Sequence, residues 1–395
     1  MNALPSAACL STKQTPYYYY DTQLLHRTLD AIKRETDKHA HFEVHYALKA
    51  NAHPQLLQQI SQAGFGADCV SGGEITAALK AGFPANKIVF AGVGKGDEEI
   101  RLALQQHIFC FHVESLEELE VINALAAQEQ QVARVALRIN PNVGAHTHAH
   151  ITTGLSENKF GIPLAQMNTA IEVCSRLKHI TLIGLHFHIG SQITDMSDFV
   201  SECQRINELQ TELNQHNIHL HYSNVGGGLG VNYDDPDGCA IPDFQSYFDT
   251  FAQHLHYTKE QTIHFELGRS VVAQCGSLIS KVLYIKEGEH KKFCIIDAGM
   301  TELLRPALYQ AHHKIENRSS QGAMDTYDVV GPICESSDVM AQGVLLPSCH
   351  RGDILAIRSA GAYGESMASQ YNGRPLVQGY LSNDFSSEER NNPHH

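Results

Sequence analysis

Lys49 is the first residue whose surroundings indicate chemistry. It follows four largely apolar residues in the segment HYALKAN, residues 45–51. A lysine that loses its water has a lowered pKa, and such an amine is a good Schiff-base nucleophile. The alternative is a lysine whose alkyl chain lies along apolar surface while its ammonium reaches water. The nucleophile hypothesis gains weight from the residues described next.

Three later segments combine glycines with polar side chains. They contain His186, His188, Gly190 and Ser191; then Gly226, Gly227, Gly228, Leu229 and Gly230; then Glu266, Leu267, Gly268 and Arg269. Glycine-rich backbone followed by an arginine can bind phosphate through N–H donors, although a glycine run by itself is usually a turn. Glu266 has the chemistry to hold a pyridine nitrogen protonated. An amine, a phosphate site and such a carboxylate together indicate pyridoxal phosphate. His188 could lie against its ring, or be a buried histidine with satisfied hydrogen bonds.

The elements that would position these residues form a regular alternation. Apolar runs typical of strands are separated by helical patterns. We expect strands at 42–48, 67–70, 87–92, 108–113, 134–140, 181–190, 219–225 and 262–267. The stretches 97–107, 115–128, 163–177 and 195–216 are helix-like. Eight such units favour a closed (β/α)8 barrel over an open doubly wound sheet, and barrels place catalytic groups where strands end.

The pattern changes after about residue 275. Short β-like runs follow, separated by turn residues: GSLISKVLYIK, KFCIID, DILAIRSAG and PLVQGYL. They predict a second, mainly β domain. The segment 141–162 is a long excursion after the fifth expected strand, and long ordered insertions at the active face of a barrel are usually functional.

Composition excludes several classes of protein. The 29 Lys+Arg against 43 Asp+Glu give a net charge of 29 − 43 = −14, which argues against a nucleic-acid surface. A hydrophobic fraction of 43% with 18% charged residues is typical of a folded globular chain. No apolar run reaches the roughly 18 to 20 residues of a membrane-spanning helix, and the first residues lack the features of a signal peptide. We expect a cytoplasmic protein with no membrane partner.

Cysteine and histidine residues leave the metal question open. The ten cysteines are dispersed without a CxxC motif, so we expect reduced thiols and no zinc site. His146, His148 and His150 alternate and could present three imidazoles on one face of an extended segment. A polar loop is the simpler interpretation, and we expect no bound metal.

Several long motifs occur in the order of a known family. They are TPYYYYD (15–21), YALKAN (46–51), ADCVSGGE (67–74), HITTGLSENKFG (150–161), HFHIGSQ (186–192), GGGLG (226–230), DAGMTELLRPALY (297–309), CESSD (334–338) and GAYGESMASQYNGRP (361–375). Through them, nearly the whole chain resembles the fold-type III pyridoxal-phosphate-dependent decarboxylases. The resemblance implies a barrel domain, residues 37–275, that binds pyridoxal 5'-phosphate. It also implies a β domain, residues 1–36 plus 276–395, that contributes substrate-site and dimer residues in a homodimer with shared active sites.

The resemblance also implies roles for individual residues. The catalytic pair would be Lys49, linked to the cofactor, and Cys334 of the partner subunit, a proton donor that by itself would be interpreted as a buried structural thiol. The cofactor would contact Lys49, His188, Ser191, Gly226, Gly227, Gly228, Glu266, Gly268, Arg269 and Tyr363. The substrate would contact Arg269, Arg305, Tyr309, Glu335 and Tyr363. The sequence departs from the family at Leu267, usually proline, and at Ser337, usually glycine.

The substrate class follows from the distal end of the bound amino acid. A second carboxylate there requires a guanidinium, which Arg305 would supply with Arg269 and Tyr309, while Glu335 would take a distal ammonium. We therefore expect decarboxylation of meso-2,6-diaminopimelate to L-lysine and CO2, the last step of lysine biosynthesis. The alternatives are a polyamine-pathway decarboxylase acting on ornithine, arginine or carboxynorspermidine, an amino-acid racemase on the same barrel, and a regulator that has lost catalysis. The CESSD and RPALY segments argue against a racemase, and the presence of both Lys49 and Cys334 argues against a regulator.

Overall fold

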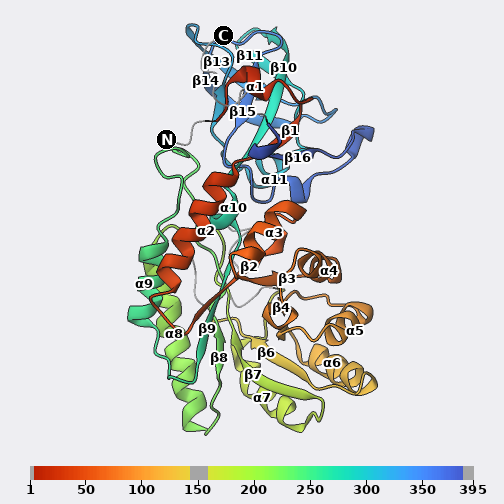
Figure 1. Ribbon diagram of the computed structural model, residues 1–395, viewed down its shortest axis with the longest axis vertical. Coiled ribbons are helices and arrows are strands. Elements are labelled where there is room, and N and C mark those ends of the chain that lie inside the picture. Colours follow the sequence, from red (N-terminus) through yellow and green to blue (C-terminus); the bar gives the residue numbers. More distant parts are fainter. Residues whose placement is uncertain (1–3, 143–158, 386–395) are drawn as a thin grey trace. The chain divides into compact units, whose positions relative to one another are not determined.

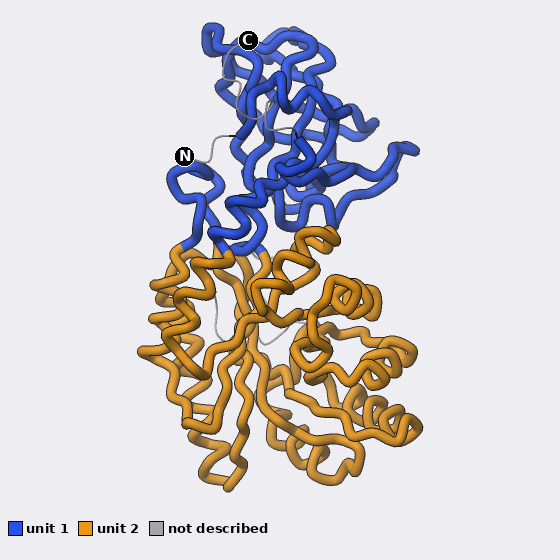
Figure 2. The backbone as a smooth tube through the Cα atoms, in the orientation of Figure 1, with its two compact units in different colours: residues 1–28, 231–242, 269–395 blue, residues 29–230, 243–268 orange. Residues whose placement is uncertain are grey.

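The computed structural model describes residues 4–142 and 159–385 of the chain. The chain divides into two compact units (Figure 2). Unit 1 consists of residues 1–28, 231–242 and 269–395, and unit 2 of residues 29–230 and 243–268. The segment 141–162 falls largely outside the described residues, as do His146, His148 and His150.

Unit 2 contains a closed barrel of eight parallel strands. They are β2 (Phe42–Ala47), β3 (Gly66–Cys69), β4 (Ile88–Phe90), β5 (Cys110–Val113), β6 (Ala133–Arg138), β7 (Ile180–His186), β8 (Tyr222–Asn224) and β9 (Thr262–Leu267). Strand β2 pairs with β9 from Phe42 opposite Ile263 to Tyr46 opposite Leu267, which closes the barrel. The predicted (β/α)8 architecture is therefore confirmed. The strands are mostly buried along their whole length, which is typical of parallel sheets covered on both faces.

Helices connect the barrel strands and lie around them (Figure 1). They are α2 (Thr22–Thr36), which begins in unit 1, and α3 (Pro54–Gln62), α4 (Gly72–Lys80), α5 (Asp97–Gln105), α6 (Leu116–Gln128), α7 (Met167–Arg176), α8 (Met196–Gln215) and α9 (Phe244–His254). Side chains cap several of their first turns. Ser71 accepts a hydrogen bond from the backbone of Glu74, and Ser115 accepts one from Glu118, so α4 and α6 begin directly after strand ends. Each helix returns the chain, and all eight strands therefore end at one rim.

Unit 1 is built on an eight-stranded, mainly antiparallel sheet. Its strands are β1 (Tyr17–Tyr20), β10 (Gly276–Glu287), β11 (Lys292–Ile296), β12 (Ile315–Asn317), β13 (Met324–Val330), β14 (Val339–Pro347), β15 (Ile354–Ile357) and β16 (Gln378–Leu381). Along the main path the order is β12-β15-β10-β11-β13-β14, and β1 pairs with β10 and β16. The predicted mainly β second region is confirmed. The sequence patterns did not single out β1, β12, β13 or β14 as strands, because β12 is very short and β13 mixes aspartates with apolar residues.

Short helices complete the two units. In unit 1 these are α1 (Ala7–Leu10), α10 (Arg269–Val272) and α11 (Arg305–Tyr309). The short 3-10 helices are η1 (Leu48–Ala50), η2 (Ala85–Lys87), η4 (Leu164–Gln166), η5 (Glu365–Met367), η6 (Tyr371–Gly373) and η7 (Ser382–Asp384). All ten cysteines carry free thiols, as expected. Among the described residues, no helix combines the length and apolar character needed to cross a bilayer.

Candidate active site

Lys49 lies directly after the end of β2, in the 3-10 turn η1. Its Nζ is 3.6 Å from Oδ2 of Asp68, the third residue of β3. Burial raises the pKa of Asp68 to about 7, helped by the negative charge of Glu266 and opposed by Lys49. The Lys49 side chain itself is 42% exposed, so the expected burial of this amine was wrong. The strand ends before Lys49, and the turn places its side chain at the rim, where the amine can meet a ligand.

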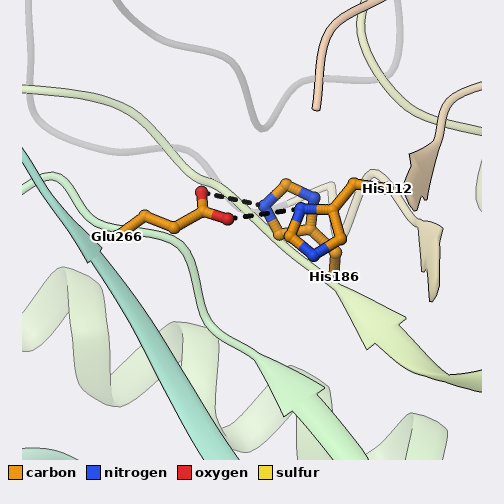
Figure 3. A group of neighbouring side chains, drawn as sticks. All are labelled: His112, His186 and Glu266. Atoms are coloured by element: carbon orange, nitrogen blue, oxygen red, sulfur yellow. Dashed lines mark hydrogen bonds and ion pairs between the residues drawn. The ribbon is translucent and has the colours of Figure 1, made fainter. Parts of the chain in front are cut away.

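Glu266, near the end of β9, holds two stacked histidines inside the barrel (Figure 3). His112 of β5 has its Nδ1 3.3 Å from Glu266 Oε1, and His186 of β7 has its Nε2 3.1 Å from Oε2. The two imidazole rings lie 4.0 Å apart at an interplanar angle of 27°. Asn224 donates a further hydrogen bond of 2.9 Å to Oε1. All four side chains are buried, and the contacts to this carboxylate come from strands β5, β7 and β8.

The charges in this cluster differ between the two imidazoles. Burial disfavours charge on His112, but the Cys110 sulfur and Glu266 outweigh it and raise the pKa of His112 to about 10. Burial lowers the pKa of His186 to about 3, so His186 is a neutral donor. Against the effect of burial, His186 and His112 together hold the pKa of Glu266 well below its usual range. The cluster is therefore an imidazolium, a neutral imidazole and a carboxylate that stays ionised.

His112 was not among the residues predicted from the sequence. The available signal was a polar residue in the middle of an apolar strand, CFHV. Within the described part of the chain, His112, His186 and Glu266 are also the one group of metal-ligand side chains close enough to hold an ion. One nitrogen of each imidazole lies within 3.3 Å of a Glu266 oxygen, while Nδ1 of His186 is buried without a hydrogen-bond partner among the described residues.

The pKa of His112 gives a testable pH dependence. Its folded value of about 10 lies above the unfolded value of about 6.5, so its stabilising effect is complete below about pH 6.5 and is lost as the pH rises towards 10. Breaking a buried pair of this kind costs about 3–5 kcal/mol. We expect His112→Gln to lower Tm strongly at pH 6.5 and less at pH 9.5.

The measurement is thermal unfolding of wild type and variant at both pH values and one ionic strength. His26→Gln, an exposed position on α2, is the matched control and should leave Tm nearly unchanged. A Tm difference for His112→Gln that is constant or grows with pH would show that His112 is not the charged member of the cluster.

The backbone after β8 passes close to both β9 and His188. Gly226 and Gly228 have positive φ angles of 70° and 108°, which favour glycine. A Cβ placed on Gly227 would lie 1.8 Å from the carbonyl oxygen of Glu266. The Gly227 amide instead donates to Nδ1 of His188 at 3.2 Å. The loop therefore requires glycine at these positions. Backbone without side chains is a surface that a phosphate can approach closely.

Unit 1 holds a second group of predicted residues, built around two buried arginines. Arg269 and Arg305 are each 6% exposed. Arg269 donates a 2.6 Å hydrogen bond to the Tyr233 hydroxyl and lies over the Tyr363 ring at 5.0 Å. Arg305 lies over the ring of the same tyrosine, Tyr233, with its guanidinium carbon 5.0 Å from the ring centroid. Tyr309 is half-buried at the end of the same short helix as Arg305.

The electrostatics of these arginines favour an anion. Burial is the largest effect on Arg305 and lowers its pKa, as does the positive charge of Arg269, whereas Tyr233 raises it. Among the described residues, no carboxylate lies within 4.0 Å of the Arg305 guanidinium. A bound anion would stabilise two buried cations that disfavour one another. Tyr233 was missed at the sequence level because nothing in its local sequence connects it to Arg269.

Cys334 and Glu335 lie in the loop between β13 and β14. Both are exposed, so the alternative of Cys334 as a buried structural thiol was wrong. The buried Asp338 accepts backbone hydrogen bonds of 2.6 Å from Met300 and 2.7 Å from Ile333, which fixes the loop. The Glu335 carboxylate accepts a 2.6 Å hydrogen bond from Tyr371. The loop thus presents a thiol and a carboxylate on a fixed backbone.

The predicted site residues consequently form two groups. Unit 2 contains Lys49, His188, Ser191, Gly226, Gly227, Gly228, Glu266 and Gly268. Unit 1 contains Arg269, Arg305, Tyr309, Cys334, Glu335 and Tyr363. Within unit 2 the structure brings together an amine, a bare glycine loop and an ionised buried carboxylate. These are the groups that a phosphorylated pyridine aldehyde requires, so the residues present fit pyridoxal phosphate.

Comparison with known proteins agrees with this chemistry. The model of the pyridoxal-binding domain of pyridoxal-dependent decarboxylases matches residues 23–273. The chain is 61% identical over 374 residues to the diaminopimelate decarboxylase of Bacteroides thetaiotaomicron, covering 95% of this chain and 97% of that relative. It is 42% identical over 368 residues to the Helicobacter pylori J99 enzyme of the same name, covering 93% and 90%. The crystal structure of Helicobacter pylori diaminopimelate decarboxylase complexed with L-lysine has a TM-score of 0.89 at 39% identity, covering 95% of this chain and 93% of that one.

The fold and the matched domain define the class: the chain is a pyridoxal-dependent decarboxylase with pyridoxal 5'-phosphate as its cofactor. Identity of 61% over nearly the full length of both chains narrows the class further. Within it, the chain belongs to the diaminopimelate decarboxylase family.

Proposed function

We propose that this chain decarboxylates meso-2,6-diaminopimelate to L-lysine and CO2, the last step of lysine biosynthesis. The observation that carries the proposal is the buried Arg305 guanidinium, which has no carboxylate within 4.0 Å among the residues described. Diaminopimelate has a carboxylate at the end of the molecule that does not react, whereas lysine, ornithine and arginine end in a cation. The names of the relatives and the L-lysine in the Helicobacter pylori structure support the same substrate.

The cofactor would be held mainly by residues of the barrel. Lys49 would bind it covalently, Glu266 would pair with its ring nitrogen, and His188 would lie against its ring. Ser191, Gly226, Gly227, Gly228, Gly268, Arg269 and Tyr363 would surround its phosphate. When bound, the cofactor accepts the electron pair left by the departing carboxylate. Glu266 supports that role because its histidines keep it ionised.

Protein side chains would then bind the substrate and move the proton. Arg305, with Arg269 and Tyr309, would hold the distal carboxylate, and Glu335 of the partner subunit would hold the distal ammonium. The Cα–carboxylate bond breaks and CO2 leaves. The Sγ–H of Cys334 of the partner subunit would donate its proton to the same Cα, on which lysine retains its amine.

The proposal includes the assembly. Residues 37–275 would form the cofactor domain, and residues 1–36 plus 276–395 a β domain that supplies substrate-site and dimer residues. Two chains would form a homodimer with shared active sites. Support comes from the exposed position of Cys334 and Glu335, which leaves both side chains accessible to a second chain. The cytoplasmic location expected from the sequence stays a prediction.

A substrate panel tests the proposed reaction. CO2 release is measured with meso-diaminopimelate, L-lysine, L-ornithine, L-arginine and carboxynorspermidine at equal concentrations. We expect diaminopimelate to have the highest kcat/KM. A preference for ornithine, arginine or carboxynorspermidine would replace the proposal with a polyamine-pathway decarboxylase.

Arg305→Ala tests the distal contact. Removing the guanidinium leaves the distal carboxylate without its charged partner, and we expect a loss of about 2–5 kcal/mol, mainly in KM. Arg305→Lys should recover part of the loss because it keeps the charge but not the bidentate geometry. Cofactor absorbance and Tm serve as folding controls. An unchanged KM in a folded Arg305→Ala protein would show that the distal carboxylate binds elsewhere.

A further inference from the structure

His313 contacts the Arg305 guanidinium and is almost fully buried, at 1% exposure. It lies in the segment between α11 and β12. Its Nε2 is 2.9 Å from Nη1 of Arg305, and its Nδ1 is 2.9 Å from the carbonyl oxygen of Arg358. Both ring nitrogens are therefore in hydrogen bonds, one to a functional side chain and one to the backbone at the end of β15.

The partners of His313 determine its tautomer. A guanidinium can only donate, so Nε2 must accept, and a carbonyl oxygen can only accept, so Nδ1 must carry the proton. Burial and the charge of Arg305 lower the pKa of His313 to about 3, which is consistent with a neutral ring. His313 therefore orients Arg305 without adding or removing charge.

Tyr233 fixes the same guanidinium from another side. The Tyr233 ring meets the His313 ring edge-on, with centroids 5.2 Å apart at 81°. Arg305 lies over the Tyr233 face, and the Tyr233 hydroxyl accepts a hydrogen bond from Arg269. Arg305 thus contacts two neutral rings, those of His313 and Tyr233, and neither cancels the positive charge of its guanidinium.

The neighbouring Arg358 shows the opposite arrangement. Its guanidinium is paired with Asp237 at 2.7 Å and with Glu316 at 3.1 Å. Those carboxylates neutralise the charge of the Arg358 guanidinium. The backbone carbonyl oxygen of Arg358 accepts the hydrogen bond from His313. Within one region the chain thus neutralises one buried arginine with acids and orients the other with an imidazole.

We propose that His313 is a positioning residue for substrate selection, and that its neutral imidazole fixes the Arg305 guanidinium for the distal carboxylate. This inference rests on the proposed function. Because His313 touches Arg305 and has its second bond to the backbone, losing it should free the guanidinium to rotate without altering the decarboxylation centre. The effect should therefore depend on whether a ligand has a distal carboxylate.

Two variants separate the two bonds of His313. His313→Asn keeps a donor near the Arg358 carbonyl but removes the acceptor for Arg305, whereas His313→Gln can extend a carbonyl oxygen to Arg305. The ligands are meso-diaminopimelate as substrate and cadaverine, a diamine that lacks the distal carboxylate, as competitive inhibitor. L-lysine does not serve here, because the product keeps the carboxylate of the end that does not react. We expect His313→Asn to raise KM for diaminopimelate about tenfold, with kcat and the cadaverine Ki changed less than about twofold. His313→Gln should recover most of the increase.

His312→Asn is the matched control. This neighbour is 60% exposed and faces Asp234, so the substitution should change neither constant. An unchanged KM in His313→Asn would overturn the inference, as would equal rises in KM and cadaverine Ki, which indicate a merely structural role. Wild-type protein that releases no CO2 from diaminopimelate would overturn the proposed function as well, so the two failures are distinguishable.

Discussion

Lys49→Ala is expected to remove the visible absorbance of the purified protein and at least about 10³-fold of its turnover. Lys49 has the position for covalent chemistry because it stands at the rim where β2 ends, with its side chain 42% exposed and its amine 3.6 Å from Asp68. Alanine keeps the 3-10 turn but has no amine to bind the cofactor aldehyde. Absorbance spectra, cofactor content after gel filtration and CO2 release measure the effect.

Lys87→Ala is the matched control for this variant. Its side chain is 40% exposed and lies 3.6 Å from a carboxylate oxygen of Glu43, so it resembles Lys49 in exposure and ion pairing. It should keep both absorbance and turnover. Borohydride reduction of wild type should leave the cofactor mass on the peptide that contains Lys49. A Lys49→Ala protein with normal absorbance and turnover would overturn the assignment of the cofactor lysine.

The barrel was predictable because its signal is local and repeated. Each strand is a buried apolar run and each helix has its own periodicity, so errors at one element do not affect the next. Strand β9 has the predicted limits, whereas β8 covers only Tyr222–Asn224 of the predicted 219–225. The sheet of unit 1 was less predictable, since β12, β13 and β14 are half-exposed and carry polar residues that do not alternate regularly.

The candidate site was predictable where a residue acts through its own side chain at a strand end. Lys49 and Glu266 became candidates in this way, and their roles stay predictions. The burial expected for Lys49 was wrong because β2 ends two residues before it. Residues that act through another residue were missed. His112 and Glu266 are separated by more than 150 positions, and only closure of the barrel brings their side chains together.

The net charge of −14 does not show where the lysine and arginine side chains lie or what they contact. Surface lysines and arginines pair with acids, as Lys292 does with Asp325. Arg269 and Arg305 are instead buried beside tyrosines and a histidine. Aromatic faces and a neutral imidazole compensate desolvation without cancelling charge. Overall charge therefore argues against a nucleic-acid partner but does not reveal a local cluster of buried cations.

Mixing two inactive variants is expected to restore activity. The loop that carries Cys334 and Glu335 is exposed over residues 334–337. The buried Asp338 side chain fixes the loop by accepting two backbone hydrogen bonds. If Cys334 serves the partner subunit, a heterodimer of Lys49→Ala and Cys334→Ala has one site with an intact lysine and an intact cysteine. Random reassociation of equal amounts then gives about a quarter of wild-type activity.

The experiment uses two differently tagged chains, unfolded and refolded together or coexpressed, followed by isolation of doubly tagged dimers and CO2 assay. Mixing Lys49→Ala with the Lys49→Ala/Cys334→Ala double variant is the control, since its heterodimer contains no complete site and must stay inactive. Doubly tagged dimers of the first pair without activity would show that each chain uses its own Cys334. Activity in the control would show that Lys49 is not required, because neither chain of the control supplies it.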